Sequence, residues 1–223
     1  TLDWKGLNTV ITARTASETA FFQIGFNRRF APASIRLRDG LTRKMGPKII
    51  QMRINVGTID AQHWVHDPRE GGGRLLGEAC HFVDLARFLI GNAIVSVSCI
   101  AAKVTDGACD DAAIALQFAD GSIADILYTA RGNTNVSKER IEAHAEGASY
   151  LIEDFRSLTV NGDKSTIPWK GAQDKGIKDG LVTFVSSVTT ENLPPVDEAE
   201  LIETSAATIA VLDSLRTGER VHL

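Results

Sequence analysis

A glutamate and a histidine stand three residues apart in the segment of this sequence that offers the clearest chemistry. The segment, residues 71–85, runs GGGRLLGEACHFVDL and contains Glu78 and His81. Residues three apart on a helix share a face, and a histidine beside a carboxylate is a common general base near neutral pH. The spacing therefore predicts an acid–base pair. A purely structural hydrogen bond between the two side chains is the competing interpretation.

The residues around this pair predict a helix over 74–90 that is covered on two sides. One apolar stripe consists of Leu75, Ala79, Val83, Ala86 and Ile90. Leu85 and Phe88 lie on the other face with His81, and Gly91 supplies a stop signal. The three glycines before the helix lack the Gly-Lys-Ser/Thr ending of a phosphate-binding loop. We interpret them as a turn that lets the backbone pass close to another group.

Two further segments carry candidate binding residues. Asn27, Arg28 and Arg29 follow the apolar run 21–26, which predicts a buried strand. Arginines at the end of a strand often face a ligand crevice, and the guanidinium fork suits carboxylate or phosphate groups. A solvated surface pair is the competing interpretation of the two arginines.

The irregular stretch 57–73 contains an aromatic residue and two histidines. Trp64 could stack on a sugar ring or merely fix the loop to the core, and both interpretations stay open. His63 and His66 have a metal-like spacing, with His81 as a conceivable third ligand, since zinc needs three or four. Nothing else in the sequence demands a metal, so we predict none.

The remaining pattern indicates an α+β fold. Helices are predicted over 3–18, 33–44, 176–190 and 197–216, and strands over 48–56, 94–104, 111–119, 122–130, 139–146 and 149–160. The tight turns Asp120-Gly121 and Asn161-Gly162 join strands into hairpins, which implies a mostly antiparallel sheet flanked by helices. Residues 138–140 and the polar face of 139–146 are interpreted as solvated strand surface.

Composition excludes several classes of protein. The chain has 223 residues with 24 Lys+Arg, 28 Asp+Glu and a net charge of −4, which argues against nucleic-acid and anionic-membrane partners. No apolar run reaches the roughly 18 residues of a transmembrane helix. The three cysteines, without C-x-x-C spacing, favour a reducing compartment, which we take to be the cytoplasm.

Two motifs resemble the Gfo/Idh/MocA oxidoreductases, the family of glucose–fructose oxidoreductase and inositol dehydrogenase. Residues 22–32, FQIGFNRRFAP, are similar to the last strand and crossover of that family's Rossmann domain. Residues 71–85 are similar to its second signature, a glycine run followed by a helix with His-x-x-Asp. The resemblance extends over essentially the whole chain. The sequence of 77–84 is also similar to a subgroup fused behind a zinc-type alcohol-dehydrogenase-like module.

The resemblance implies a domain organisation. Residues 1–30 would be a remnant of an NAD(P)-binding Rossmann domain, and 31–223 an α+β substrate and oligomerisation domain with an open-faced sheet. The sheet face would form a homo-oligomer interface. The sequence contains neither G-x-G-x-x-G nor the family's Glu-Lys-Pro motif. We therefore expect NAD or NADP to be bound mainly outside this chain, and the chain alone to be inactive.

The resemblance also implies roles for residues. The family's catalytic histidine corresponds to His81, whereas the aspartate common four residues earlier is Gly77 here, with Glu78 as a neighbouring substitute. The substrate would be a sugar, cyclitol or sugar nucleotide. The substrate side of the cleft between the two domains would be lined by Asn27, Arg28, Arg29, His63 and Trp64. The alternative function is a non-catalytic binding or dimerisation module that lacks a cofactor domain.

Overall fold

The described part of the chain is built around one nine-stranded sheet. The computed structural model describes residues 1–17, 22–60, 62–67, 69–102, 109–190 and 193–223. The strand order within these residues is β8-β7-β6-β5-β1-β4-β3-β2-β9. All neighbouring strands are antiparallel except β1 and β4, which are parallel. The predicted α+β class with a mostly antiparallel sheet is confirmed.

The strands follow the predicted alternation, with one correction. They are β1 (Ile49–Asn55), β2 (Ile94–Ala101), β3 (Ala112–Phe118), β4 (Ile123–Thr129), β5 (Glu139–Ala145), β6 (Ala148–Glu153), β7 (Ser157–Asn161), β8 (Trp169–Lys170) and β9 (Val221–His222). The single strand predicted over 149–160 is wrong. Asp154 and Phe155 both have positive φ angles, so the chain turns there and forms the two strands β6 and β7.

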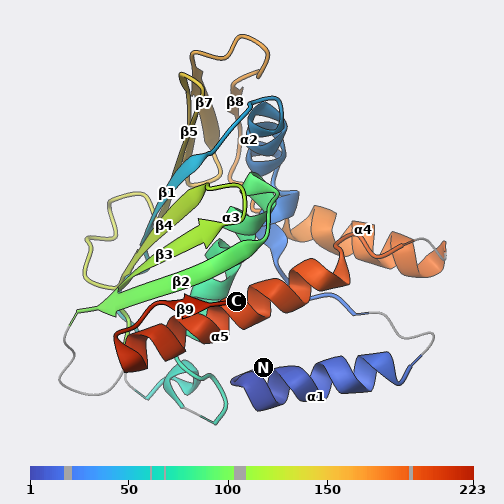
Figure 1. Ribbon diagram of the computed structural model, residues 1–223. Coiled ribbons are helices and arrows are strands. Elements are labelled where there is room, and N and C mark those ends of the chain that lie inside the picture. The colour runs from blue at the N-terminus through green and yellow to red at the C-terminus, as the bar shows by residue number, and fades with distance from the viewer. Residues whose placement is uncertain (18–21, 61, 68, 103–108, 191–192) are drawn as a thin grey trace.

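One face of the sheet is covered by helices and the other is open (Figure 1). The covering helices are α2 (Pro32–Thr42), α3 (Cys80–Ile90) and α5 (Glu198–Thr217). Along β1, Ile50, Met52 and Ile54 are fully buried beneath them, whereas Ile49 and Gln51 lie on the open face and are exposed. Alternation of this kind is what a sheet with one packed face requires.

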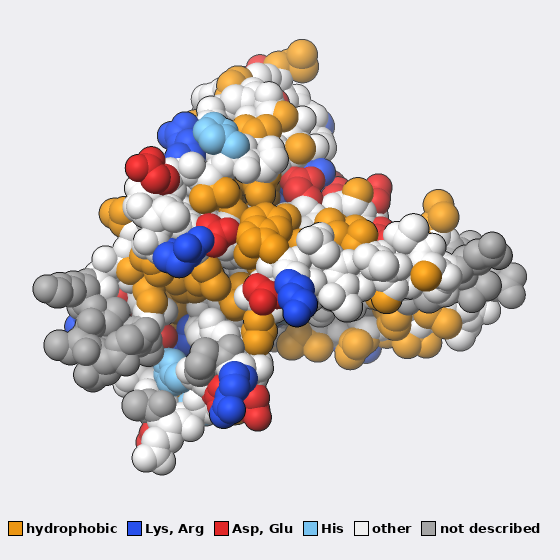
Figure 2. All heavy atoms as spheres, turned by 60° about the horizontal axis from the view of Figure 1, so that its bottom comes forward, with side chains coloured by type: hydrophobic (Ala, Val, Ile, Leu, Met, Phe, Trp, Pro, Cys, Tyr) orange, Lys and Arg blue, Asp and Glu red, His pale blue; other side chains and the backbone are white. Residues whose placement is uncertain are grey.

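Two helices lie outside this layer. Helix α1 (Trp4–Thr15) is joined to α5 by hydrogen bonds from Trp4 Nε1 to Asp213 (2.6 Å) and from Arg14 Nε to Glu198 (2.9 Å). Helix α4 (Ile177–Thr189) projects from the body (Figure 1). Exposed hydrophobic side chains lie along the arm at the right of Figure 2, and those of α4 are Ile177, Leu181, Val182, Val185 and Val188. Among the described helices, none combines the length and apolar character that a bilayer span requires.

The strand predicted over 21–26 is wrong for the described residues 22–26. Phe26 N donates to Ile24 O (2.7 Å) and Asn27 N to Gly25 O (2.8 Å), so the chain makes tight turns and enters the 3-10 helix η1 (Asn27–Phe30). No described strand lies beside the segment to pair with it. Its apolar side chains instead form a small cluster with two residues near the start of α5, Val196 and Leu201.

The helix predicted over 74–90 forms, but its first turn is wider than an α-helix. Residues Leu75–Ala79 form the π-helical turn η3, and α3 follows directly until Gly91, whose φ of +77° ends the helix. The predicted apolar stripe is buried, as expected. A π turn inside a helix is often found at functional sites, and this one lies immediately before His81.

A buried ion pair fixes η1 against α3. Arg29 Nη2 and Nε contact the two carboxylate oxygens of Asp84 at 2.6 and 3.1 Å, and Arg29 Nη1 contacts Glu200 of α5 at 3.0 Å. Both members of the Arg29–Asp84 pair are buried. The aspartate of the His-x-x-Asp motif therefore joins three elements of the fold.

Loss of this carboxylate should destabilise the protein strongly. Asp84→Ala leaves the Arg29 guanidinium buried without its main partner, and we expect the free energy of unfolding to fall by about 3–5 kcal/mol in urea titrations. The matched control is Asp39→Ala, whose pair with Arg38 is exposed and should cost no more than about 1 kcal/mol. Equal losses in the two variants would contradict this account.

Candidate functional site

His81 occupies the first turn of α3, at the covered side of the sheet. Its ring meets the ring of Phe26 edge-on, with 5.8 Å between centroids and an interplanar angle of 82°. Its Nδ1 atom is buried and has no hydrogen-bond partner among the described residues. Buried polar atoms are almost always paired with protein, water or ligand, so this nitrogen lacks the partner that such an atom normally has.

The surroundings of His81 keep its ring neutral. Burial, and secondarily the charge of Arg28, lower the pKa of His81 from 6.5 to about 4, although Glu139 and Glu78 oppose this shift. A neutral imidazole can accept a proton at neutral pH. The positive neighbour also means that an imidazolium formed at this position is disfavoured and readily gives the proton up again.

A charge cluster lies on one side of His81. Arg28 Nε and Nη2 donate to the two carboxylate oxygens of Glu139 at 3.0 and 2.9 Å, and Lys175 Nζ donates to Glu139 Oε1 at 2.7 Å. The Arg28 guanidinium lies 4.5 Å above the ring centroid of Phe82. Burial alone would raise the pKa of Glu139, but hydrogen bonds from both cations lower it. The two cations share one carboxylate, so the cluster has a net positive charge.

Glu139 and Lys175 are functional candidates that the sequence analysis missed. Residues 138–140 had the pattern of a solvated strand, yet Glu139 is fully buried. Asn27 Nδ2 donates to the backbone oxygen of Lys175 at 2.6 Å. No local signal marks Glu139, because its partners are distant in sequence.

Glu78 affects His81 through its charge but does not bind it. Arg74 Nε donates to Glu78 Oε1 at 3.0 Å, and no described hydrogen bond joins Glu78 to His81. Burial by itself raises the pKa of Glu78, but hydrogen bonds from Arg74 and Tyr128, together with the charge of Arg74, outweigh this effect and lower it. Glu78 is thus ionised and acts on His81 through its charge.

The loop before the helix presents Trp64 to solvent. Trp64 is 60% exposed, and the His63 ring lies 5.7 Å from it at a tilt of 35°. Beneath them Val65 is buried, and its carbonyl accepts a hydrogen bond from Gly73 N at 2.8 Å. A Cβ atom at Gly71 would collide with this carbonyl, which confirms that the glycine run is a turn with close backbone contact.

The described residues do not support a metal centre. They contain no group of three or more His, Cys, Asp or Glu side chains placed to hold a metal ion. The Nε2 atom of His66 instead lies 3.8 Å from Asp110 Oδ2. The alternative in which His63, His66 and His81 share a zinc ion therefore has no geometric basis here.

A polar hollow opens at the end of β1. It has a volume of about 480 Å³ and is lined by Asn55, Val56, Thr134, Asn135, Val136, Ser137, Lys138 and Asp154. Asn55 Nδ2 donates to Asn133 O at 2.8 Å, and its Oδ1 atom is buried without a described partner. Two of its lining residues adjoin the buried Glu139: Lys138 precedes it in sequence, and Asp154 Oδ1 accepts a hydrogen bond from Glu139 N at 2.7 Å. Amide and hydroxyl groups of this kind suit a polyhydroxylated ligand.

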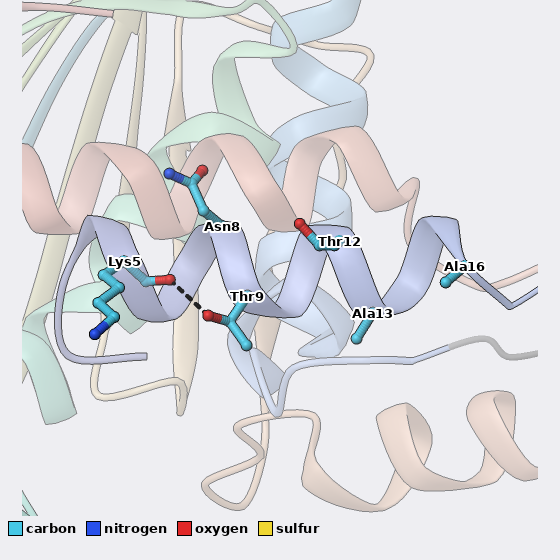
Figure 3. A pocket seen from close by; sticks show the side chains of 6 residues that line it. All are labelled: Lys5, Asn8, Thr9, Thr12, Ala13 and Ala16. Carbon is cyan, nitrogen blue, oxygen red and sulfur yellow. Dashed lines mark hydrogen bonds between the residues drawn. The ribbon is translucent and has the colours of Figure 1, made fainter.

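A second, wider hollow runs along α1 and has no comparable chemistry. It measures about 710 Å³ and is lined by Lys5, Asn8, Thr9, Thr12, Ala13 and Ala16 (Figure 3). Five of these residues belong to α1 and Ala16 follows its last residue, and the hydrogen bond drawn among them runs from Thr9 Oγ1 to the Lys5 backbone oxygen. Without an acid or a histidine in its lining, this surface is not assigned a catalytic role.

Comparison with known proteins finds the expected resemblance. Residues 47–151 match the family model of the Gfo/Idh/MocA C-terminal domain. The chain is 30% identical over 165 residues to an inositol 2-dehydrogenase of Rhizobium meliloti, and the match covers 70% of the chain. The match covers 49% of that dehydrogenase, about half its length.

Solved structures show the same fold. An aldose-aldose oxidoreductase from Caulobacter crescentus, complexed with glycerol, matches with a TM-score of 0.82 and 18% identity over 100% of this chain and 69% of that one. An oxidoreductase from Agrobacterium radiobacter, in complex with NAD+, L-tartaric acid and magnesium, matches with a TM-score of 0.78 and 13% identity over 99% and 70% of the two chains. The resemblance expected from the two sequence motifs is supported by the family-model match over 47–151, and the expected fold is confirmed.

The low pKa of His81 makes a testable contribution to stability. Because its pKa is about 4 in the folded chain against an ordinary 6.5, the unfolded chain binds the proton first as the pH falls through this window. Folding is therefore progressively penalised between about pH 6.5 and pH 4. Urea unfolding at several pH values should show a smaller loss of stability for His81→Gln than for the unmodified chain.

The control for this measurement is His144→Gln, because His144 is exposed on β5. That variant should follow the unmodified chain across the same pH range. The account is contradicted if NMR titration gives His81 a pKa at or above 6.5.

Proposed function

We propose that these residues form the substrate-binding and oligomerisation domain of an NAD(P)-dependent oxidoreductase. The reaction would interconvert a hydroxyl and a ketone on a sugar, cyclitol or sugar nucleotide. One observation carries the proposal: a neutral, partly buried histidine with an unpartnered ring nitrogen lies in the His-x-x-Asp helix of a Gfo/Idh/MocA domain. The similarity to an inositol 2-dehydrogenase supports a polyhydroxylated substrate.

His81 would be the catalytic base of this reaction. Its ring accepts the proton of the substrate hydroxyl, while a bound nicotinamide cofactor supplies the hydride chemistry at the adjacent carbon. Phe26 restricts the ring to one plane through their edge-on contact. Arg28 disfavours a lasting imidazolium, and Glu78 partly offsets that effect. The histidine can thus take up the proton and release it again.

Some of the predicted substrate-binding residues are exposed to solvent, whereas others are already engaged in hydrogen bonds and ion pairs within the fold. Trp64 and His63 are exposed, and the aromatic face of Trp64 suits the C–H face of a sugar ring. Arg29 is committed to Asp84 and Glu200, and the Asn27 amide to Lys175 O. We therefore assign direct substrate contact to Trp64 and His63, and a structural role to Arg29.

The cofactor would be held mainly by a domain outside these residues. The sequence has no G-x-G-x-x-G motif, and the described strands do not form the parallel strand-loop-helix unit that binds a dinucleotide pyrophosphate. In this proposal residues 1–30 belong to the cofactor domain and 31–223 to the substrate domain. The position of α1 outside the helix layer supports that boundary.

Calorimetric titration with NADH tests whether the cofactor is bound mainly outside the 223-residue chain. We expect no measurable binding to the 223-residue chain, and binding to a longer polypeptide that joins it to its cofactor domain. An oxidoreductase assay of the longer polypeptide with myo-inositol as probe substrate tests the reaction class. Tight NADH binding by the 223-residue chain would show that the cofactor site is built from residues assigned other roles here.

The open sheet face would form the homo-oligomer interface. It exposes the hydrophobic residues Ile49, Ile100, Ile123 and Leu127. Adjacent strands place Ile49 beside Ile123, so the apolar residues form part of a continuous surface. A hydrophobic surface shared by identical chains is well suited to a two-fold interface.

A single charge on this face should disrupt the oligomer. Leu127 is 46% exposed at the middle of the open face, so Leu127→Asp would place a carboxylate in the interface and should convert oligomer to monomer in sedimentation velocity experiments. Met45→Asp is the control, because Met45 is 78% exposed but lies in the loop before β1. An unmodified chain that is monomeric at high concentration would refute the interface.

A further inference from the structure

A buried arginine, seven residues before His81, connects three separate segments. Arg74 is only 2% exposed. Its Nη1 atom donates to the backbone oxygen of Gly57 at 2.8 Å, and its Nε atom donates to Glu78 at 3.0 Å. The same Nη1 lies 3.8 Å from Asp110 Oδ2. Its guanidinium is 5.5 Å from the centroid of the Tyr128 ring on β4.

The contact with Gly57 closes the neck of the loop that presents Trp64. Gly57 is the first residue of the stretch 57–73, and Arg74 follows its last residue directly. The hydrogen bond therefore joins the two ends of this loop across 17 positions of sequence. Because the same guanidinium also holds Glu78, the neck is fixed to the π turn that precedes His81.

The planar guanidinium group of Arg74, with several N–H donors, is needed to make these contacts at the same time. Nε and Nη1 bind two acceptors that lie in different directions, which a single ammonium group cannot do with the same geometry. A buried guanidinium is costly unless it is paired. Within the described residues its pairing depends on Glu78 and, more distantly, on Asp110.

Unsatisfied polar atoms surround this guanidinium. Asp110 Oδ1 and His66 Nδ1 are buried and have no described hydrogen-bond partner. His66 Nε2 and Arg74 Nη1 each lie 3.8 Å from Asp110 Oδ2, a gap that suits a bridging water. Asp110 thus stands between Arg74 and a histidine two residues from Trp64. The loop is attached to Arg74 at its neck directly and near Trp64 through Asp110.

We propose that Arg74 is a positioning residue of the substrate site. It fixes the position of the loop that carries Trp64 relative to His81. It does not touch the substrate. It acts through Gly57 at the neck of the loop, through Glu78 at the π turn, and through Asp110 toward His66. This inference rests on the proposed function for the roles of His81 and Trp64.

Hydrogen exchange of the 223-residue chain tests the structural half of the inference. Arg74→Lys keeps the charge but loses the fork, and we expect amides of the described loop residues to exchange about tenfold faster or more, with β1 unchanged. Arg87→Lys is the matched control, because Arg87 is a mostly buried arginine of α3 that pairs with Glu203. It should leave exchange of the loop unchanged.

Kinetics of the longer enzyme with myo-inositol test the functional half. Arg74→Lys should raise KM about tenfold with a smaller change in kcat, because the loop binds substrate and His81 remains in place. Unchanged loop exchange in Arg74→Lys overturns the role of Arg74. If the loop amides exchange faster in Arg74→Lys but the unmodified enzyme shows no turnover, Arg74 still holds the two ends of the loop together. The proposed function is then refuted.

Discussion

The buried ion pair between Arg29 and Asp84 sets the position of His81 relative to the sheet. Asp84 and His81 lie on one helix, so fixing Asp84 to η1 also fixes the histidine. Arg28 then donates hydrogen bonds to Glu139 on β5, and the ring of Phe26 contacts the His81 ring. The two adjacent arginines thus hold one short segment to the helix layer and to the sheet. The environment of the histidine is a consequence of this geometry.

That environment accounts for the chemistry that His81 can perform. Burial and Arg28 keep the ring neutral, and the ionised carboxylates of Glu139 and Glu78 limit how far this effect goes. Each of the two carboxylates is itself paired with an arginine. Neither is free to take a proton from the ring. In the proposed reaction the His81 ring therefore accepts the proton from the substrate and later releases it, without passing it to Glu139 or Glu78. The two ion pairs adjust the basicity of His81 through their charges only.

Local signals sufficed for the elements of the fold, and long-range pairing explains what sequence analysis missed. The alternation in β1, the Asp120-Gly121 turn and the stop at Gly91 depend on near neighbours, and each was predicted. Glu139 was missed because its partners lie 111 and 36 positions away. The strand expected over 21–26 failed because its apolar side chains pack on residues near α5. His81 and Glu78 were found from their spacing, but the partner of Glu78 was not.

The central claim is that His81 is the catalytic base, and the activity of a His81→Ala enzyme tests it most directly. The measurement is the turnover rate of the longer polypeptide with substrate and cofactor, together with its affinity for NADH. We expect turnover to fall by about 10²–10⁴-fold, with NADH affinity unchanged because the proposed cofactor site lies outside these residues. An enzyme that retains full turnover without this imidazole would contradict the account.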